Sequence, residues 1–376
     1  MLRIILSLMN VLTLSAYNTE MNIQSLIQEY VEDSGAVGAA VGFIDNGTVQ
    51  FYTYGKKSVN GDRPISEDTI FEIGSITKVF TTLAFADMAE RGSVRLDDPV
   101  EKYLPGINKK LSLLQLASHT SGLPRMPDLF NPQNPNNPYA DYTAQKLLDD
   151  INRCTITRTP GESFEYSNIG MGLLSHILCI HSGKNYEELI RSAITGPLGM
   201  KNTSVHLTPE MIENFAHGHH QRQQVEYWDF TGLAGTGALR SNIKDMTLFL
   251  SANMGLTKSP LDALMKQCHQ KVFALSPVFA VGLGWIVSQS NNAEIIYHNG
   301  GTGGFRSYLG FNPKLKRGVV VLSNSTEEWP DELGLVLLDP DFKRPVVDKS
   351  LANKALMAGK QVMFEAEPKK VEAAKL

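Results

Sequence analysis

Apolar residues near the start of the chain first follow helical spacing and then change to the patterns of strands. Over residues 21–34 they recur three or four positions apart, which predicts a helix ending at Gly35. Residues 36–44 are apolar and rich in Val and Gly, and residues 48–54 alternate in polarity. The Asn-Gly pair between these two stretches predicts a hairpin with a type I′ turn. The chain is therefore expected to open with a helix and two paired strands.

Helical periodicity dominates the middle of the chain, and strand patterns return near its end. The predicted helices cover residues 79–91, 144–152, 170–182, 186–195 and 244–253. The later predicted strands cover residues 282–288, 294–298, 305–312 and 318–323, before a short helix at 330–338. Residues 122–140 are rich in Pro and Asn, which predicts a long surface loop of the kind that often carries function.

The two groups of predicted strands lie at opposite ends of the sequence, and each needs a partner face. The economical solution is an α+β fold, with an antiparallel sheet built from both chain ends and flanked by helices. A mostly helical domain is then inserted into it. We expect the sheet domain to comprise residues 20–70 and 275–340, and the helical domain to comprise residues 71–274.

Composition narrows the classes of partner. The 376 residues contain 35 Lys and Arg against 39 Asp and Glu, a net charge of −4. No basic stripe follows any predicted helix, so nucleic acid is not expected as a partner. Three widely spaced cysteines do not make a disulfide framework. Nothing in the sequence indicates an obligate protein partner.

The two ends of the chain have patterns of their own. Residues 1–16 contain one basic residue and a mostly apolar run that ends in two small residues, which fits a short signal peptide. This predicts a periplasmic or secreted protein, and the alternative is an uncleaved extension on a cytoplasmic one. The run is too short to span a bilayer. Residues 341–376 are expected to form a solvated tail of mixed charge.

The first candidate for chemistry is Ser75-Ile76-Thr77-Lys78, at the start of a predicted helix. Residues three apart on a helix are neighbours, so a neutral Lys78 could accept the proton of the Ser75 hydroxyl. Burial or a nearby cation would lower the Lys78 pKa enough for that role. By itself the pattern fits equally a capping serine followed by a solvated lysine.

The second candidate is Tyr166-Ser167-Asn168, which precedes another predicted helix. A tyrosine hydroxyl beside a lysine ammonium can have a lowered pKa and relay a proton. The Asn168 amide offers both an acceptor and donors, so it could hold Lys78 and a substrate amide together. By itself this pattern also fits a packed tyrosine followed by a helix cap.

The third candidate is His298-Asn299-Gly300-Gly301, at the end of a predicted strand. Glycines here allow a ligand to approach the backbone closely. A backbone N–H from this strand could complete an oxyanion hole with the N–H of Ser75. Taken alone, the segment is equally a glycine-rich turn with a surface histidine.

The three segments in this order resemble the penicillin-binding-protein-like serine hydrolases. The resemblance is to the branch of class C β-lactamases and D-alanyl-D-alanine carboxypeptidases, whose boxes read Ser-x-x-Lys, Tyr-x-Asn and Lys/His-x-Gly. It covers about residues 22–325 and implies a β-lactamase/transpeptidase-like fold. Other stretches resemble the family too: Phe71-Glu72-Ile73-Gly74, His119-Thr120-Ser121-Gly122-Leu123-Pro124, Pro197-Leu198-Gly199-Met200 and Gly282-Leu283-Gly284-Trp285.

The resemblance implies a role for each residue. Ser75 would be the acylated nucleophile, and Lys78 and Tyr166 would share the general-base and general-acid work. Asn168 would orient Lys78 and the substrate amide, and the N–H groups of Ser75 and Gly301 would form the oxyanion hole. No metal or organic cofactor is implied. The substrate would be a small molecule or peptide with an amide bond, either a β-lactam or a D-Ala-D-Ala peptide.

The third box departs from the β-lactamase pattern. His298 would replace the lysine usual in class C β-lactamases, and Asn299 replaces the usual hydroxyl residue. With Gly300 and Gly301, these residues would bind substrate. A histidine binds a carboxylate through charge only when it is protonated. The departure weakens the expectation of penicillin hydrolysis but not that of acylation by a β-lactam.

Two alternatives therefore remain open. One is a carboxylic-ester hydrolase with the same Ser75, Lys78 and Tyr166. The other is a non-catalytic binding protein on the same fold.

The segment His217-Gly218-His219-His220 raises the question of a zinc site. Zinc needs further ligands that converge on one point, and no Asp or Glu follows closely. We therefore expect a loop beside the site rather than a metal centre.

Overall fold

The computed structural model describes residues 23–127, 130–156, 158–289, 293–339 and 342. The predicted signal peptide at 1–16 and nearly all of the predicted tail at 341–376 lie outside these residues, so both stay predictions. Within the described ranges, no helix is both long and apolar enough to cross a membrane.

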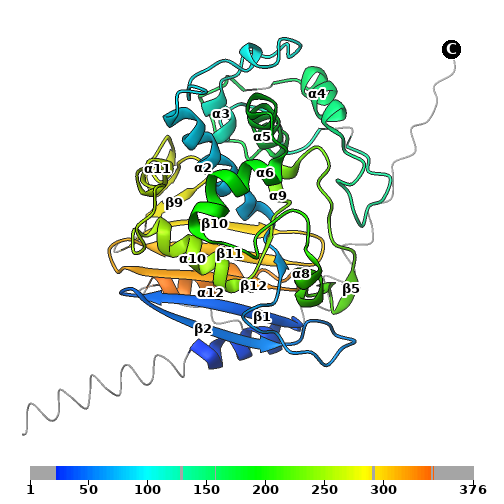
Figure 1. Ribbon diagram of the computed structural model, residues 1–376, viewed down its shortest axis with the longest axis vertical. Helices are drawn as coiled ribbons and strands as arrows, with labels where there is room; N and C mark the ends of the chain where they lie inside the picture. Colours follow the sequence, from blue (N-terminus) through cyan, green and yellow to red (C-terminus); the bar gives the residue numbers. More distant parts are fainter. Residues whose placement is uncertain (1–22, 128–129, 157, 290–292, 340–341, 343–376) are drawn as a thin grey trace, which may run out of the picture. The chain divides into compact units, whose positions relative to one another are not determined.

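An eight-stranded antiparallel sheet runs through the fold in the order β2-β1-β12-β11-β10-β9-β8-β7 (Figure 1). Strand β1 from the start of the chain lies between β2 and β12, and Val41 pairs with Tyr52 on one side and Val321 on the other. The sheet is thus built from both chain ends. Its strands are β1 (Gly38–Asp45), β2 (Thr48–Gly55), β7 (Phe273–Ser276), β8 (Phe279–Val281), β9 (Ile286–Gln289), β10 (Glu294–Gly301), β11 (Arg306–Asn312) and β12 (Arg317–Ser323).

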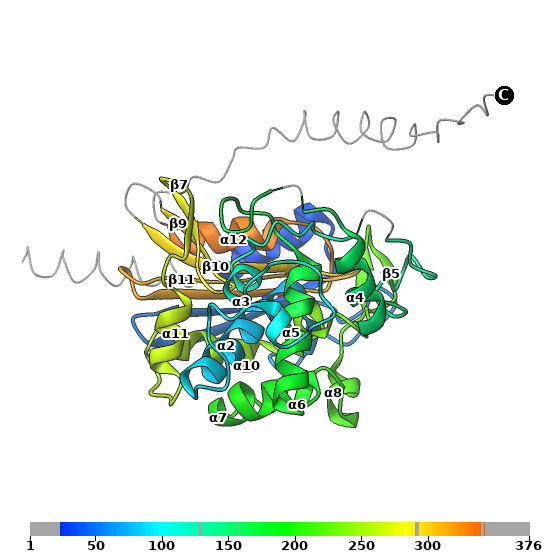
Figure 2. The same ribbon diagram turned by 90° about the horizontal axis from the view of Figure 1, so that it is seen from above.

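The helices form a block on one face of the sheet and a thin layer on the other (Figure 2). The thin layer is the helix at residues 23–34 together with α12 (Trp329–Leu338). The block contains α2 (Thr77–Glu90), α3 (Leu113–Ala117), α4 (Ala144–Arg153), α5 (Asn168–Ser182), α6 (Tyr186–Ile190), α7 (Gly196–Leu198), α8 (Pro209–Asn214), α9 (Ala234–Gly237), α10 (Ile243–Asn253) and α11 (Asp262–Cys268). It also carries three short turns, η1 (Gly74–Ile76), η2 (Val100–Lys102) and η3 (Arg191–Thr195), and four short strands, β3 (Phe71–Glu72), β4 (Gly218–His220), β5 (Gln223–Val225) and β6 (Arg240–Ser241).

Strand β1 shows why the sheet needs cover on both faces. It is buried along almost its whole length, because successive side chains point to opposite faces and both faces are packed. Ala40 and Ile44 join the core shared with the helical block, whereas Val41 and Phe43 join the core shared with α12. The α+β fold with a sheet from both chain ends is therefore confirmed. The domain boundaries at residues 70 and 275 stay predictions.

Most predicted elements occur with shifted ends. The Asn46-Gly47 turn has positive φ at both residues, as a type I′ turn requires, and Asp45 pairs with Thr48 across it. The helix predicted over 186–195 is α6 followed by the π-helical turn η3.

The strand predicted over 282–288 forms only at its end, as part of β9, and β8 already ends at Val281. The cause is the glycine-containing turn between them, where Gly284 has φ +73°. A Cβ at Gly282 would lie only 2.3 Å from the backbone oxygen of Cys268, so this turn packs directly on the end of α11. The apolar run reflects that packing rather than a continuous strand.

Candidate active site

Ser75 lies on a tight turn between the short strand β3 and helix α2. Gly74 begins the turn in the left-handed region, with φ +50°, which favours glycine. A Cβ at Gly74 would lie 2.7 Å from the backbone nitrogen of Gly301. Because Gly74 has no side chain, the turn that carries Ser75 can pack against the end of β10.

Lys78 is one helical turn from Ser75 and is completely buried. Its Nζ lies 3.0 Å from Ser75 Oγ and donates a hydrogen bond of 2.8 Å to the backbone oxygen of Thr236. Burial, assisted by the positive charge of Arg125, lowers the Lys78 pKa well below its usual value. A neutral amine beside a serine hydroxyl is an arrangement that can remove the serine proton.

Tyr166 lies beside the Ser75–Lys78 pair. Lys78 Nζ lies 4.9 Å from the centre of the Tyr166 ring. Burial raises the Tyr166 pKa to about 12, although the Ser75 side chain and the charge of Arg125 act in the opposite direction. The expected lowering of this pKa is therefore wrong. Tyr166 carries its proton at neutral pH and is placed to donate it.

His119 packs on Tyr166 from the loop that follows α3. The two rings stack with their centres 4.5 Å apart. The backbone of His119 has φ +57°, which is uncommon for a residue with a side chain, and its Nδ1 accepts a hydrogen bond from the N–H of Ser167. This contact ties the His119 loop to the segment that carries Tyr166.

Asn168 is the first residue of α5, directly after the helix cap at Ser167. Its Oδ1 is buried and has no hydrogen-bond partner among the described residues. Lys78 Nζ is held instead by Thr236 and Ser75. A buried acceptor without a partner, two residues after Tyr166, is suited to receive a substrate N–H.

His298 lies on β10 and is buried against the same centre. Its Nδ1 lies 2.6 Å from the backbone oxygen of Asn299, so Nδ1 carries the proton and Nε2 is an acceptor. Burial, with a smaller effect from Lys78, lowers the His298 pKa to about 3. The imidazole is therefore neutral at pH 7, and the third box supplies no positive charge to a carboxylate.

The rest of the third box divides between the two faces of the sheet. A Cβ at Gly300 would lie 2.9 Å from the backbone nitrogen of Ser75, so β10 packs directly on the turn that carries Ser75. The Asn299 side chain instead donates a 2.6 Å hydrogen bond to Asp331 on α12. Asn299 was expected to bind substrate; its side chain is engaged on the other face of the sheet, and a role in substrate binding stays a prediction.

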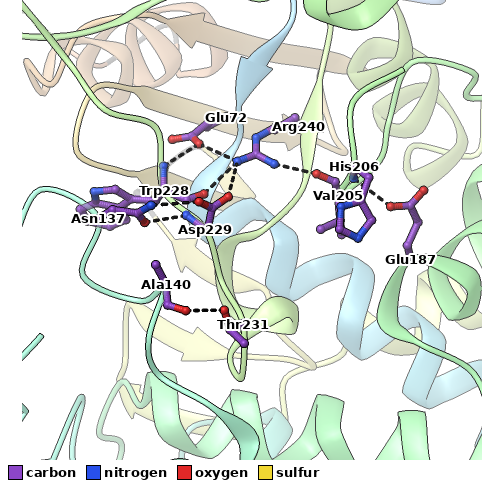
Figure 3. A network of polar contacts seen from close by, with 10 residues as sticks. All are labelled: Glu72, Asn137, Ala140, Glu187, Val205, His206, Trp228, Asp229, Thr231 and Arg240. Atoms are coloured by element: carbon purple, nitrogen blue, oxygen red, sulfur yellow. Dashed lines mark hydrogen bonds and ion pairs between the residues drawn. The ribbon is translucent and has the colours of Figure 1, made fainter. Parts of the chain in front are cut away.

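A buried ion pair supports the turn that carries Ser75 (Figure 3). Glu72 on β3 and Arg240 on β6 lie opposite each other in the strand pairing, with Arg240 Nη2 3.3 Å from Glu72 Oε1. Arg240 also donates to the backbone oxygens of Val205 and Trp228, and the N–H of Trp228 donates to Glu72. These contacts join the loop at residues 226–232 to β3, which ends two residues before Gly74.

The histidine cluster at residues 217–220 has a structural role in part. His219 is buried, with Nδ1 2.9 Å from the backbone oxygen of Asn324 and Nε2 accepting from the N–H of Val59. Both ring nitrogens are thus engaged by backbone groups. In the parts of the chain that the structure describes, no group of three or more His, Cys, Asp and Glu residues is placed to hold a metal ion.

The sequence matches the family model described as Beta-lactamase over residues 23–338. The chain belongs to the beta-lactamase family. Among curated relatives of this beta-lactamase-family chain, the beta-lactamase of Escherichia coli is 26% identical over 351 residues, covering 82% of this chain and 89% of the relative. The beta-lactamase of Yersinia enterocolitica is 27% identical over 360 residues, covering 83% and 89%. Protein flp of Staphylococcus aureus is 26% identical over 338 residues, covering 84% and 65%.

Solved structures agree on the fold. One class C beta-lactamase superimposes with a TM-score of 0.76 at 22% identity, covering 86% of this chain and 96% of the other. A class C beta-lactamase in complex with cefoxitin has a TM-score of 0.75 at 22% identity, covering 84% and 96%. Family membership makes the chain a serine hydrolase of the beta-lactamase type.

Several residues around the centre of this beta-lactamase-family chain were not anticipated from sequence. Thr236 contacts Lys78 through its backbone oxygen, which every residue has, so the residue type at position 236 does not reveal the contact. Glu72 and Arg240 are far apart in sequence, and only the pairing of β3 with β6 brings them together. Arg125 directly follows the Leu123-Pro124 of a stretch that resembles the family, and its exposed guanidinium lies over the ring of Tyr166. The position of Arg125 next to that stretch was the sequence feature that could have identified it as part of the site.

Proposed function

We propose that the protein hydrolyses amide bonds through an acyl-enzyme on Ser75, with a D-Ala-D-Ala peptide or a β-lactam as substrate. The observation that carries this proposal is the group at Ser75, whose hydroxyl lies 3.0 Å from the buried Lys78 amine, while that amine lies 4.9 Å from the centre of the Tyr166 ring. The curated relatives named beta-lactamase support the β-lactam as one substrate class.

Acylation follows from the protonation states of these groups. Neutral Lys78 takes the proton of Ser75 as Oγ attacks the carbonyl carbon, and the N–H groups of Ser75 and Gly301 stabilise the oxygen that becomes negative. Tyr166 donates its proton to the leaving nitrogen and regains one from the Lys78 ammonium, so the C–N bond breaks and the amine leaves neutral. Water then attacks the ester and passes a proton back through the same groups, which releases the acid and restores Ser75.

An ester substrate is the second candidate. It is favoured by the neutral state of His298 and by the bond between Asn299 and Asp331, because the third box then offers no charge to a substrate carboxylate. An alkoxide or phenolate leaving group also needs less proton assistance than an amine does, so the same Ser75 centre would serve.

A panel of three substrates distinguishes the candidates. Purified protein is assayed with a chromogenic cephalosporin, an N-acylated D-Ala-D-Ala peptide and a short-chain aryl ester, with Ser75→Ala as the blank for each. The amide proposal predicts a higher kcat/KM for the peptide or the cephalosporin than for the ester. An ester preference of a hundredfold or more would favour the second candidate. Equal rates for wild type and Ser75→Ala on all three would contradict both.

A further inference from the structure

We infer that Arg125 binds a carboxylate of the substrate. This inference rests on the proposed function, since it concerns the substrate of the same serine centre. It assigns to Arg125 an anion subsite beside the Tyr166 ring, and to the substrate a free carboxylate group.

The backbone around Arg125 is fixed to the catalytic segment. The backbone oxygen of Arg125 accepts a 3.0 Å hydrogen bond from the N–H of Asn168. The neighbouring oxygen of Pro124 accepts a 2.8 Å hydrogen bond from the hydroxyl of Ser167. Two consecutive residues of the loop are therefore bonded to two consecutive residues that follow Tyr166, which holds the start of the Arg125 side chain in a defined place.

The guanidinium itself points over the catalytic ring. Its central carbon lies 5.1 Å from the centre of the Tyr166 ring, while the residue as a whole is exposed. An arginine that lies over a ring still has N–H groups at its edge, and these match a carboxylate in a two-pronged geometry. The positive charge of Arg125 also contributes to lowering the pKa of Lys78 and of His119, so it acts within electrostatic reach of the centre.

The other cations near the serine are not available to an anion. Arg240 is paired with Glu72, and Arg306 next to Gly301 is held by Asp331 at 2.8 Å. Lys78 is buried and has a lowered pKa. No carboxylate of the described residues forms an ion pair with Arg125. An exposed, permanently charged side chain without an acidic partner among the described residues, placed over the Tyr166 ring, is what an anionic substrate needs.

Matched pairs of substrates test this inference. One pair places the carboxylate on the leaving group: an N-acylated D-Ala-D-Ala peptide and its C-terminal carboxamide. The other places it on the acyl group: p-nitrophenyl hydrogen glutarate and its methyl ester. Each pair shares its scissile bond and differs in one negative charge. The kcat/KM values are measured for wild type, Arg125→Gln, Arg125→Lys and the control Arg158→Gln, which removes an exposed arginine paired with Glu165 at 3.6 Å.

The expected result is a selective loss. In Arg125→Gln, kcat/KM for the carboxylate member of at least one pair falls by about 10- to 100-fold, as for a lost hydrogen bond to a charged group, and its neutral partner falls much less. The affected pair shows which side of the substrate carries the carboxylate. Arg125→Lys recovers part of the loss, and Arg158→Gln behaves as wild type.

Two results would overturn the inference. An equal fall for the charged and neutral members of both pairs would mean that Arg125 acts only by tuning Lys78 and Tyr166. No selective fall in either pair would mean that the guanidinium does not contact the substrate. Hydrolysis of none of the four compounds by wild type would instead contradict the proposed function, and the inference with it.

Discussion

Replacing Gly74 with alanine separates backbone strain from damage to the oxyanion hole. Gly74 has φ +50°, and its Cβ would lie 2.7 Å from the nitrogen and 2.9 Å from the oxygen of Gly301. The left-handed conformation costs an L-residue about 1–2 kcal/mol. The contact with Gly301 adds a second effect, because two backbone segments must move apart and take the proposed oxyanion donors with them.

Gly92 provides the matched control. It follows the end of α2 with φ +70°, and a Cβ there would meet nothing within 4 Å. Gly92→Ala therefore has the conformational cost without the clash. We expect both variants to lower Tm, and Gly74→Ala to lower it further.

The decisive measurement is kcat/KM on the best substrate of the panel. Gly74→Ala should lose about 10²–10³ in kcat/KM, the usual cost of one oxyanion-hole donor. Gly92→Ala should stay within about twofold of wild type, because its site is untouched. If Gly74→Ala has the Tm and the kcat/KM of Gly92→Ala, the packing of Gly74 on Gly301 does not set the oxyanion geometry and the reasoning is refuted.

Three further predictions concern protonation and buried charge. Tyr166→Phe should lower kcat/KM by about 10²–10⁴ with little change in Tm, and full activity in this variant would show that Lys78 acts without the phenol. The folded pKa of His298 is about 3 against an ordinary value of 6.5, so the unfolded chain binds this proton first and folding stability falls as pH drops from 6.5 towards 3. His298→Asn should remove up to about 1.4 kcal/mol per pH unit of that fall, measured by denaturant unfolding at pH 7 and pH 5, and an unchanged slope would show that the imidazole is not buried neutral. Arg240→Met leaves Glu72 buried without its partner and should cost about 3–5 kcal/mol in unfolding free energy. The double variant with Glu72→Gln should recover a large part of it, and no recovery would mean that Arg240 stabilises by packing alone.

The sequence could predict those parts of the fold and site that depend on residues close together in the chain. Periodicity identified the strands that become β1 and β12, and the first two boxes identified Ser75, Lys78 and Tyr166, which the structure brings together. Residues three apart at a helix start must be neighbours, so this part of the centre needs no knowledge of the rest of the chain.

The parts that sequence could not predict depend on burial and on distant partners. A histidine in the sequence does not reveal that burial keeps His298 neutral. A tyrosine does not reveal that burial raises the Tyr166 pKa. The orientation of Asn299 is a different case. Strand alternation places it on the face opposite its neighbours His298 and Gly300, so the two-residue period of β10 carried the information.

The most direct test of the account is to find where an acyl group is attached. Wild-type protein is incubated with a penicillin, quenched in acid, and measured by intact-mass spectrometry before peptide mapping. The account predicts a gain of one penicillin mass, located on Ser75, and no gain in Ser75→Ala. An adduct on another residue, or an equal adduct in Ser75→Ala, would contradict the assignment of Ser75 as the nucleophile.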